Sequence, residues 1–244
     1  MKVFKCDLHI HTCLSPCASL EMSPVAIVEE SLGRGLDLIA ICDHNSAENA
    51  GAVIRAGAER GLHVLPGMEI NSIEEVHSLA IFDSEKQAAA MQEIVYRHLD
   101  GINNPDIFGE QIVANEFDEV EGFNPRMLIG GTGLKLDEIV REVQGLGGLS
   151  IASHVDRPSY SIVSQLGFIP PGLDLDAVEV SYRTKIEDLA DSIPEIMELP
   201  VIRSSDAHFY KDIGRVYTSF FIETPSVNEI RMALWGKRGR RVVN

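Results

Sequence analysis

The residues of this 244-residue chain that could hold a metal ion begin with an H-x-H sequence, His9 and His11, directly after the first apolar stretch. Strand side chains alternate between faces, so a strand over residues 3–8 that continues to His11 places both imidazoles on one side. Two neutral imidazoles at this spacing can chelate one cation. Alone, the sequence is weak evidence for a metal site. Further candidates follow or end other strand-like stretches: Asp43-His44, Glu69, His77, His154 and Asp206-Ala207-His208.

The elements that must position these residues alternate between strand and helix. Leu36–Cys42 is an apolar stretch broken only by Asp37, which is typical of a buried parallel strand. Repeated strand–helix units with short loops predict an α/β fold, with a parallel sheet closed into a barrel or wound as an open sheet. The polar candidates collect at the carboxyl ends of strands, where such folds place their sites. The other expected strands are 63–65, 76–82, 149–152, 177–180, 201–202 and 217–222; helices are expected from residue 24, over 47–60, 84–99 and 135–146, and from residue 226.

Composition limits the classes of function. The net charge of −16 argues against broad, non-specific binding of nucleic acid, but it allows a small phosphate ester or the end of a short oligonucleotide in a local site. No stretch approaches the roughly 18 apolar residues of a membrane span, and the first residues lack a signal-peptide pattern, so we expect a cytoplasmic protein without a membrane partner. We expect the cysteines to be core thiols or metal ligands rather than disulfides. They are Cys6, Cys13, Cys17 and Cys42.

Residues 100–131 interrupt the alternation. The segment carries seven acidic residues before its first basic residue, Arg126, and runs into Gly130-Gly131-Thr132-Gly133. Two interpretations are open: a solvated insertion, or a cap over the mouth of a site. We expect an insertion, with the glycines forming a turn. The acidic residues are Asp100, Asp106, Glu110, Glu116, Asp118, Glu119 and Glu121.

Six short motifs, taken in order, resemble those of the PHP family, the polymerase and histidinol phosphatase type of metal-dependent phosphoesterase. They read D-L-H-I-H-T at 7–12, C-D-H-N at 42–45, G-M-E at 67–69, V-H at 76–77, S-H-V-D-R at 153–157 and S-D-A-H at 205–208. The resemblance spans residues 3 to about 223. It implies one domain over residues 1–244, folded as a distorted seven-stranded (β/α)7 barrel of PHP type. It also implies two or three divalent transition metal ions at the mouth of the barrel.

The resemblance further implies which residues hold these ions. His9, His11, Glu69 and Asp206 would hold the first metal; Glu69, His77 and His154 the second, with Glu69 bridging; and His44 and His208 the third. Mixed imidazole and carboxylate donors suit Zn, Mn or Fe. Asp7 and Asp43 would orient the imidazoles.

One loop departs from the family pattern. The family usually supplies a histidine or acidic ligand shortly after its H-x-H, whereas this loop reads Ser15-Pro16-Cys17. Cys17 would therefore complete the third site. The alternative is a small buried thiol packed against the first helix.

The implied activity is a metal-dependent phosphoric ester hydrolase that uses a metal-activated hydroxide. Glu69, Asp206 and Arg157 are the expected catalytic residues, with Arg157 binding phosphate oxygens; Arg183 and Arg203 are weaker candidates for that role. The substrate would be a small phosphomonoester, a cyclic phosphodiester or the end of a short oligonucleotide. Two alternatives are an amidohydrolase-like enzyme that attacks a C–N bond and a non-catalytic metal-binding scaffold. The pairs Asp43-His44 and Asp206-x-His208 favour the phosphoesterase.

Overall fold

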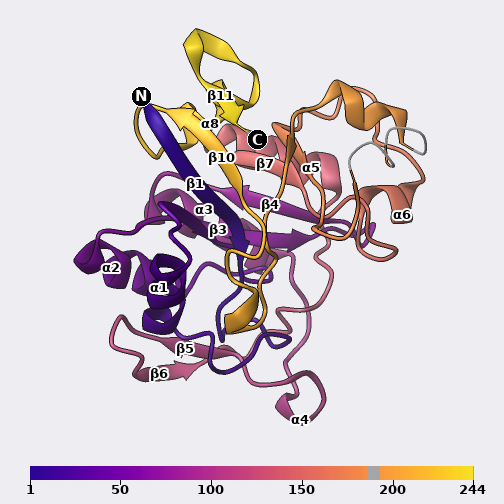
Figure 1. Cartoon of the computed structure of the whole chain (residues 1–244). Helices are drawn as coiled ribbons and strands as arrows, with labels where there is room; N and C mark the ends of the chain where they lie inside the picture. The colour runs from indigo at the N-terminus through magenta and orange to yellow at the C-terminus, as the bar shows by residue number, and fades with distance from the viewer. Residues whose placement is uncertain (186–188, 190–192, 244) are drawn as a thin grey trace.

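The computed structural model describes residues 1–185, 189 and 193–243 and has a mixed α/β fold around one large sheet (Figure 1). Within the described residues, that sheet has nine strands in the order β11-β10-β1-β2-β3-β4-β7-β8-β9. The strands are β1 (Lys2–Ile10), β2 (Leu38–Ile41), β3 (His63–Asn71), β4 (His77–Ile81), β7 (Leu149–Ala152), β8 (Ala177–Glu179), β9 (Val201–Ile202), β10 (Thr218–Ile222) and β11 (Arg241–Val243).

The predicted seven-stranded barrel is wrong in its strand count and in part of its strand direction. β1, β2 and β3 are parallel, as are β7, β8 and β9, but β4 runs antiparallel to both of its neighbours. Only residues 72–76 connect β3 to β4, which is too short for the crossover that parallel strands require. The strands β10 and β11 extend the sheet antiparallel beside β1.

The sheet curls, so that the chain after β9 returns to β1. Ile10 forms a parallel bridge with Ala207. The Thr218 hydroxyl accepts a hydrogen bond from the Arg203 backbone N–H and donates one to the Arg203 carbonyl, both at 2.8 Å. The concave side is filled by apolar residues from both halves of the sheet, including Phe4, Leu79 and Phe220. The curl therefore gathers the carboxyl ends of β1, β2, β7 and β9 at one end of the sheet.

Five of the seven α-helices in the described residues lie where the sequence predicts them, and the short ones over 105–108 and 162–166 were not predicted. Ser84 and Ser226 cap two of the predicted helices, each through a side-chain oxygen that accepts a hydrogen bond from a backbone N–H three residues later. One-turn 3-10 helices lie over Pro194–Glu198, Tyr210–Asp212 and Lys237–Gly239. No helix of the described residues is both long and apolar enough to cross a membrane. The α-helices are α1 (Pro24–Gly33), α2 (Ala50–Arg60), α3 (Glu85–Arg97), α4 (Pro105–Phe108), α5 (Leu136–Gly145), α6 (Ile162–Leu166) and α8 (Val227–Leu234).

The segment 100–131 contains α4 and a separate two-stranded sheet, β5 (Ile112–Ala114) with β6 (Val120–Phe123). Figure 1 places these elements beyond the carboxyl end of β1. The segment is tied to the loop after the H-x-H sequence, because the Ile112 N–H donates to the Cys13 carbonyl at 3.0 Å. The Asn45 side-chain amide donates to the carbonyls of Leu128 and Gly130 at 2.7 and 2.8 Å. These bonds fix the segment against the loops that carry the site.

Candidate metal centre

The curl of the sheet brings most of the predicted metal ligands together. We call the following eight residues the donor cluster: His9, His11, His44, Glu69, His77, His154, Asp206 and His208. His9 lies near the end of β1, His44 follows β2, and Asp206 follows β9. The first six members are buried, and the side chains of Asp206 and His208 are 5% and 20% exposed. Burial of so many polar groups is costly unless they have partners or hold an ion.

His9, His11 and Asp206 have the spacing of ligands to one ion. The Nε2 atoms of His9 and His11 lie 3.1 Å apart. Asp206 Oδ1 lies 3.4 Å from the first of these atoms and 3.2 Å from the second. Two ligands about 2.0–2.2 Å from a common ion are roughly 3–3.5 Å apart. These three residues therefore form a group of donors that fits a single divalent cation.

Glu69 in β3 is the centre of the donor cluster. Its Oε1 lies 3.1 Å from both His77 Nδ1 and His154 Nε2, and its Oε2 lies 3.2 Å from His44 Nδ1. The same carboxylate is 3.4 Å from His9 Nε2. A carboxylate with two oxygens directed at different imidazoles has the chemistry of a bridge between two cations.

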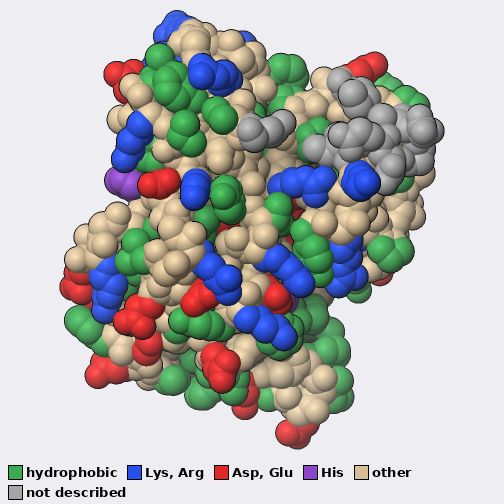
Figure 2. Space-filling model, viewed as in Figure 1, with side chains coloured by type: hydrophobic (Ala, Val, Ile, Leu, Met, Phe, Trp, Pro, Cys, Tyr) green, Lys and Arg blue, Asp and Glu red, His purple; other side chains and the backbone are tan. Residues whose placement is uncertain are grey.

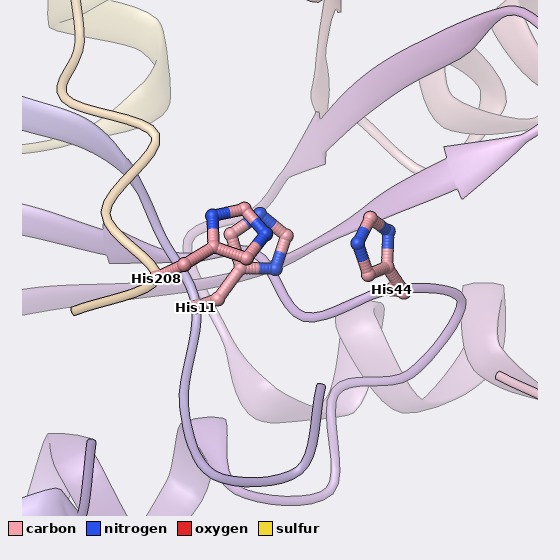
Figure 3. Close-up of side chains that lie close together, drawn as sticks. All are labelled: His11, His44 and His208. Carbon is pink, nitrogen blue, oxygen red and sulfur yellow. The ribbon is translucent and has the colours of Figure 1, made fainter. Parts of the chain in front are cut away.

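A third group consists of three imidazoles, shown in Figure 3. The rings of His11 and His208 lie against each other with their centres 4.0 Å apart, and the centre of the His44 ring is 4.7 Å from that of His11. His208 comes from the segment after β9 and His44 from the loop after β2, so the two strand ends face each other across His11.

Burial and neighbouring charges keep two imidazoles and one carboxylate of the donor cluster in the forms that bind metal. Burial, together with the charge of His208, lowers the pKa of His11 to about 3, and burial and His11 hold the pKa of His44 well below its usual value. Burial raises the pKa of Glu69, but the charges of His77 and His9 outweigh it and hold that pKa well below the usual range. Neutral imidazoles and ionised carboxylates are the forms that bind metal.

Unsatisfied atoms point to the same conclusion. Neither carboxylate oxygen of Asp206 makes a hydrogen bond to the described part of the chain, although an arginine and several imidazoles lie close to it. Buried polar atoms are normally bonded, so such an exception requires an explanation. A divalent cation between Asp206, His9 and His11 provides one, and the donors present therefore fit the implied metal.

Glu179, at the end of β8, is a functional residue that the sequence analysis missed. It is buried, and its carboxylate oxygens lie 3.0 and 3.2 Å from His9 Nδ1. By accepting a hydrogen bond from Nδ1–H, it leaves Nε2 of His9 free to bind a metal. Its signal in the sequence is an acidic residue inside the apolar stretch 177–180.

The expected roles of Asp7 and Asp43 require correction, because neither carboxylate contacts an imidazole directly. Asp7 accepts hydrogen bonds from the backbone N–H groups of Ser205 and Gly214, each at 2.9 Å, and so holds the segment after β9. Asp43 accepts a bond from the Ser15 hydroxyl at 2.7 Å, and Ser15 Oγ lies 3.0 Å from His11 Nδ1. Asp43 therefore acts on His11 only through Ser15.

The three candidate arginines differ in their surroundings. Arg157 contacts the Asp206 carboxylate directly and is 42% exposed, so it lies at the rim of the donor cluster. Arg203 donates to the backbone carbonyls of Ser181 and Thr184 at 2.6 and 2.7 Å, which gives it a structural role. Arg183 is exposed on the loop after β8.

Comparison with known proteins supports this picture. The family model described as PHP-associated matches residues 187–237. The resemblance to the PHP family is thereby confirmed. An uncharacterized Bacillus subtilis protein, YqxK, is 30% identical over 117 residues, which cover 46% of this chain and 29% of that protein. The chain thus spans less than a third of this relative.

Solved structures share the fold. The lesion-specific endonuclease EndoQ of Pyrococcus furiosus is 21% identical with a TM-score of 0.72, over 98% of this chain and 57% of its own. It has also been seen with a 27-mer duplex whose abasic lesion lies at the active site. A putative metal-dependent phosphoesterase of Bifidobacterium adolescentis has 21% identity and a TM-score of 0.56, over 83% of this chain and 87% of its own. An amidohydrolase of Chromobacterium violaceum has 18% identity and a TM-score of 0.57, over 86% and 89%.

The ligand sets implied by the PHP resemblance differ from the observed grouping at all three sites. The first observed group, His9 with His11 and Asp206, does not include Glu69. The structure groups Glu69 with His44 and His77, whereas His154 lies outside that group and contacts it through Glu69 and through the ring of His77. Cys17 belongs to none of the three donor groups found among the described residues, and its side chain is exposed rather than packed against α1 as a buried thiol. The third group has His11 where a ligand from the loop after the H-x-H was expected.

Proposed function

We propose that this chain hydrolyses a phosphate ester with the aid of two or three divalent transition metal ions, Zn, Mn or Fe. The observation that carries the proposal is the donor cluster itself. Three overlapping groups of donors surround Glu69, and a partly exposed arginine lies on one of them. One substrate phosphate could contact the cluster and Arg157 at the same time.

The carboxylates, the imidazoles and Arg157 would have different roles in this reaction. Divalent ions in such a cluster lower the pKa of water and neutralise the charge of a phosphate. Glu69 and Asp206 would supply the negative charge that holds the ions, and the imidazoles would fix the positions of the ions. Arg157 presents a guanidinium that can bind two phosphate oxygens at once. Asp206 contacts both Arg157 and the imidazoles, so it couples the position of the anion to that of the donors.

An amidohydrolase-like activity on a C–N bond is the main alternative, and one structure of the same fold carries that name. Arg157 favours the phosphoesterase, because a fixed positive charge at the rim suits an anionic substrate better than a neutral amide. A non-catalytic scaffold is disfavoured, since it has no evident reason to keep buried carboxylates and imidazoles together.

The proposed substrate class is a small phosphate-containing molecule or the end of a short oligonucleotide. The endonuclease of the same fold acts on DNA, which supports an oligonucleotide. The net charge of −16 is unfavourable for broad contact with a polyanion, so recognition would be confined to the neighbourhood of the donor cluster.

A substrate screen tests the proposal. Purified protein is stripped with a chelator, dialysed, and assayed with and without Mn, Zn or Fe on four classes of substrate: phosphomonoesters, cyclic phosphodiesters, short oligonucleotides and hydantoin-like amides. We expect hydrolysis of at least one phosphate ester, lost on chelation and restored by metal, and absent from Glu69→Gln. Hydrolysis of the amides alone would show the alternative to be correct. Inactivity on all four classes with full metal content would favour the scaffold.

A further inference from the structure

A pocket of about 210 Å³ adjoins the donor cluster. It shares Asp206 and His208 with the cluster, and its other walls carry cationic and aromatic side chains. Basic side chains gather across the middle of the face shown in Figure 2, where Figure 1 shows the segment between β9 and β10. We call this space the arginine pocket. Its lining residues are Arg157, Tyr182, Arg183, Ser205, Asp206, His208, Phe209, Asp212 and Arg215.

The loop that carries Tyr182 and Arg183 is fixed from two sides. The Asp156 carboxylate accepts hydrogen bonds from the Ser181 N–H at 2.8 Å, the Ser181 hydroxyl at 2.6 Å and the Thr184 hydroxyl at 2.7 Å. From the other side, the Arg203 guanidinium donates to the carbonyls of Ser181 and Thr184. Such a loop loses little further freedom when a ligand binds, so its side chains are preorganised.

Tyr182 positions two arginines. Its hydroxyl accepts a hydrogen bond from Arg183 Nε at 3.1 Å, and the Arg215 guanidinium lies 4.1 Å from the centre of its ring. Arg215 also pairs with Asp212 at 3.3 Å. In the part of the chain that the structure describes, no carboxylate lies within 4.0 Å of the Arg183 guanidinium. Among the described residues Arg183 thus differs from Arg157 and Arg215, which each contact a carboxylate, in a protein whose overall charge is strongly negative.

Phe209 gives the arginine pocket an apolar surface. It directly follows His208 of the donor cluster and is 51% exposed. An exposed aromatic ring beside cationic side chains is the arrangement with which proteins bind single-stranded nucleic acid, because each base can stack on the ring while the cations bind the backbone. A simple alkyl phosphomonoester has no flat face to place against such a ring.

We propose that the arginine pocket binds the nucleotide next to the phosphoester that is cleaved, with Arg183 and Arg215 at its phosphate and Phe209 against its base. The substrate is then a short nucleotide chain rather than a small phosphomonoester. The pocket is smaller than the roughly 300–1,000 Å³ of a complete ligand site, in keeping with one nucleotide beside a separate reaction centre. This inference rests on the proposed function, since it names the substrate class of the same site.

The first test is kinetic. Wild type, the double variant Arg183→Gln/Arg215→Gln and the control Arg141→Gln, an exposed arginine on α5, are compared on 5′-phosphorylated trithymidylate and on p-nitrophenyl phosphate. We expect the ratio of kcat/KM for the trinucleotide to that for the small ester to fall at least tenfold in the double variant. Arg141→Gln should keep the wild-type ratio. An unchanged ratio in the double variant would overturn the inference.

The second test measures binding rather than turnover. A fluorescein-labelled trithymidylate with phosphorothioate linkages, which slow hydrolysis, is titrated with Mn-loaded protein and followed by fluorescence anisotropy. Phe209→Ala should weaken binding about five- to tenfold. It should leave the Kd of an abasic chain of the same length within twofold. Equal weakening of both ligands, or of neither, would show that Phe209 does not hold a base.

The outcomes separate this inference from the proposed function. Trithymidylate binding that depends on Arg183, Arg215 and Phe209 supports the arginine pocket even if no phosphoester is cleaved. The lack of cleavage would in that case count against the proposed function alone. Metal-dependent hydrolysis with wild-type selectivity in all the variants would support the proposed phosphoesterase activity. It would overturn the inference that the arginine pocket binds a nucleotide. All the substituted side chains are exposed, and thermal unfolding of each variant checks that the fold is kept.

Discussion

The donor cluster and the arginine pocket share a wall but are built differently. The members of the donor cluster lie in strands or directly after them and are mostly buried, so their positions are set by the sheet. The cationic and aromatic side chains of the arginine pocket lie on loops and are exposed to solvent: Arg157, Tyr182, Arg183, Phe209 and Arg215. Interactions in the buried cluster are little screened by salt, whereas those of the exposed arginines are weaker and sensitive to salt. The comparison assigns metal binding to the first region and choice of substrate to the second.

The largest effect should come from Glu69, which contacts donors of every group. Replacing its carboxylate with the neutral amide of Glu69→Gln removes the bridging charge. We expect the loss of more than one metal ion per chain and a fall in kcat/KM on the order of 10³-fold. Elemental analysis and steady-state kinetics measure the two quantities. Glu93→Gln, an exposed carboxylate on α3, should change neither; retention of full metal content by Glu69→Gln would contradict the bridging role.

Arg157 contacts Asp206 of the donor cluster and also lines the arginine pocket. Its substitution tests whether it serves substrate binding or metal binding. In Arg157→Gln we expect KM to rise about 30- to 150-fold, because a charge-assisted contact to phosphate is worth about 2–3 kcal/mol. Because Arg157 also contacts Asp206, metal content is measured on the same sample and should stay at the wild-type level. Loss of metal without a change in KM would place Arg157 with the donor cluster instead.

Glu179 should affect the donor cluster alone. Glu179→Gln weakens the hydrogen bond that orients His9, so we expect metal affinity to fall about 10- to 100-fold. At saturating metal, KM for the substrate should remain within twofold of wild type. Competition with a chelating dye gives the affinity, and a rise in KM at saturating metal would mean that Glu179 also influences substrate binding.

Protons should compete with metal ions for the donor cluster. Burial lowers the pKa of His9, but the carboxylates of Glu179, Asp206 and Glu69 outweigh it and raise that pKa well above its usual value. The His9 proton stabilises the metal-free fold fully below the unfolded pKa of about 6.5, and this contribution is lost as pH rises through the higher folded pKa. A metal ion must displace that proton. The Kd for Mn²⁺ should therefore fall as pH rises, by up to about tenfold per unit.

Titrations of metal-free protein with Mn²⁺ at pH 6.5, 7.5 and 8.5 measure this dependence. Glu179→Gln serves as the comparison, because removal of one carboxylate should lower the pKa of His9 and flatten the curve. A Kd that does not vary with pH in wild type would mean that His9 is already deprotonated in the metal-free protein.

The smallest effect is expected at Cys17. Its side chain is exposed and belongs to none of the donor groups of the described chain, so Cys17→Ser should leave metal content unchanged and kcat/KM within about twofold. Burial of its sulfur, with the charge of Glu69 adding to it, raises the pKa of the Cys17 thiol to about 12, so labelling at neutral pH should be slow and should proceed at the same rate with and without metal. Protection from labelling until the metal is stripped would restore Cys17 as a ligand.

Much of the site was accessible from the sequence because strand ends and donor types leave clear local patterns. His9 and His11 could be placed on one face from strand alternation, and His44 and Glu69 followed from apolar stretches that end in polar residues. The structure brings these residues together as expected. Local pattern is sufficient here because carboxyl ends of neighbouring parallel strands meet at one edge.

What the sequence analysis missed depends on partners far away in the chain. An apolar stretch does not reveal its neighbour in the sheet. The strands at 76–82 and 217–222 were therefore predicted, but the antiparallel direction of β4 and the antiparallel pairing of β10 with β1 were not, and β11 was not predicted at all. Glu179 contacts His9 across 170 residues, and its strand has only three residues to show an alternation. Arg203 could not be separated from Arg183, because its role depends on the carbonyls of a loop that forms only in the folded chain.

The central claim is that the donor cluster holds the ions on which phosphoester hydrolysis depends. Its most direct test is a titration of chelator-stripped protein with Mn²⁺, with bound metal and the release of hydrolysis products, phosphate or nucleotide, from 5′-phosphorylated trithymidylate measured on the same samples. The account predicts no release without metal, a rate that rises with the second ion bound per chain, and neither metal uptake nor release in Glu69→Gln. Release at full rate from the stripped protein, or from Glu69→Gln, would contradict it.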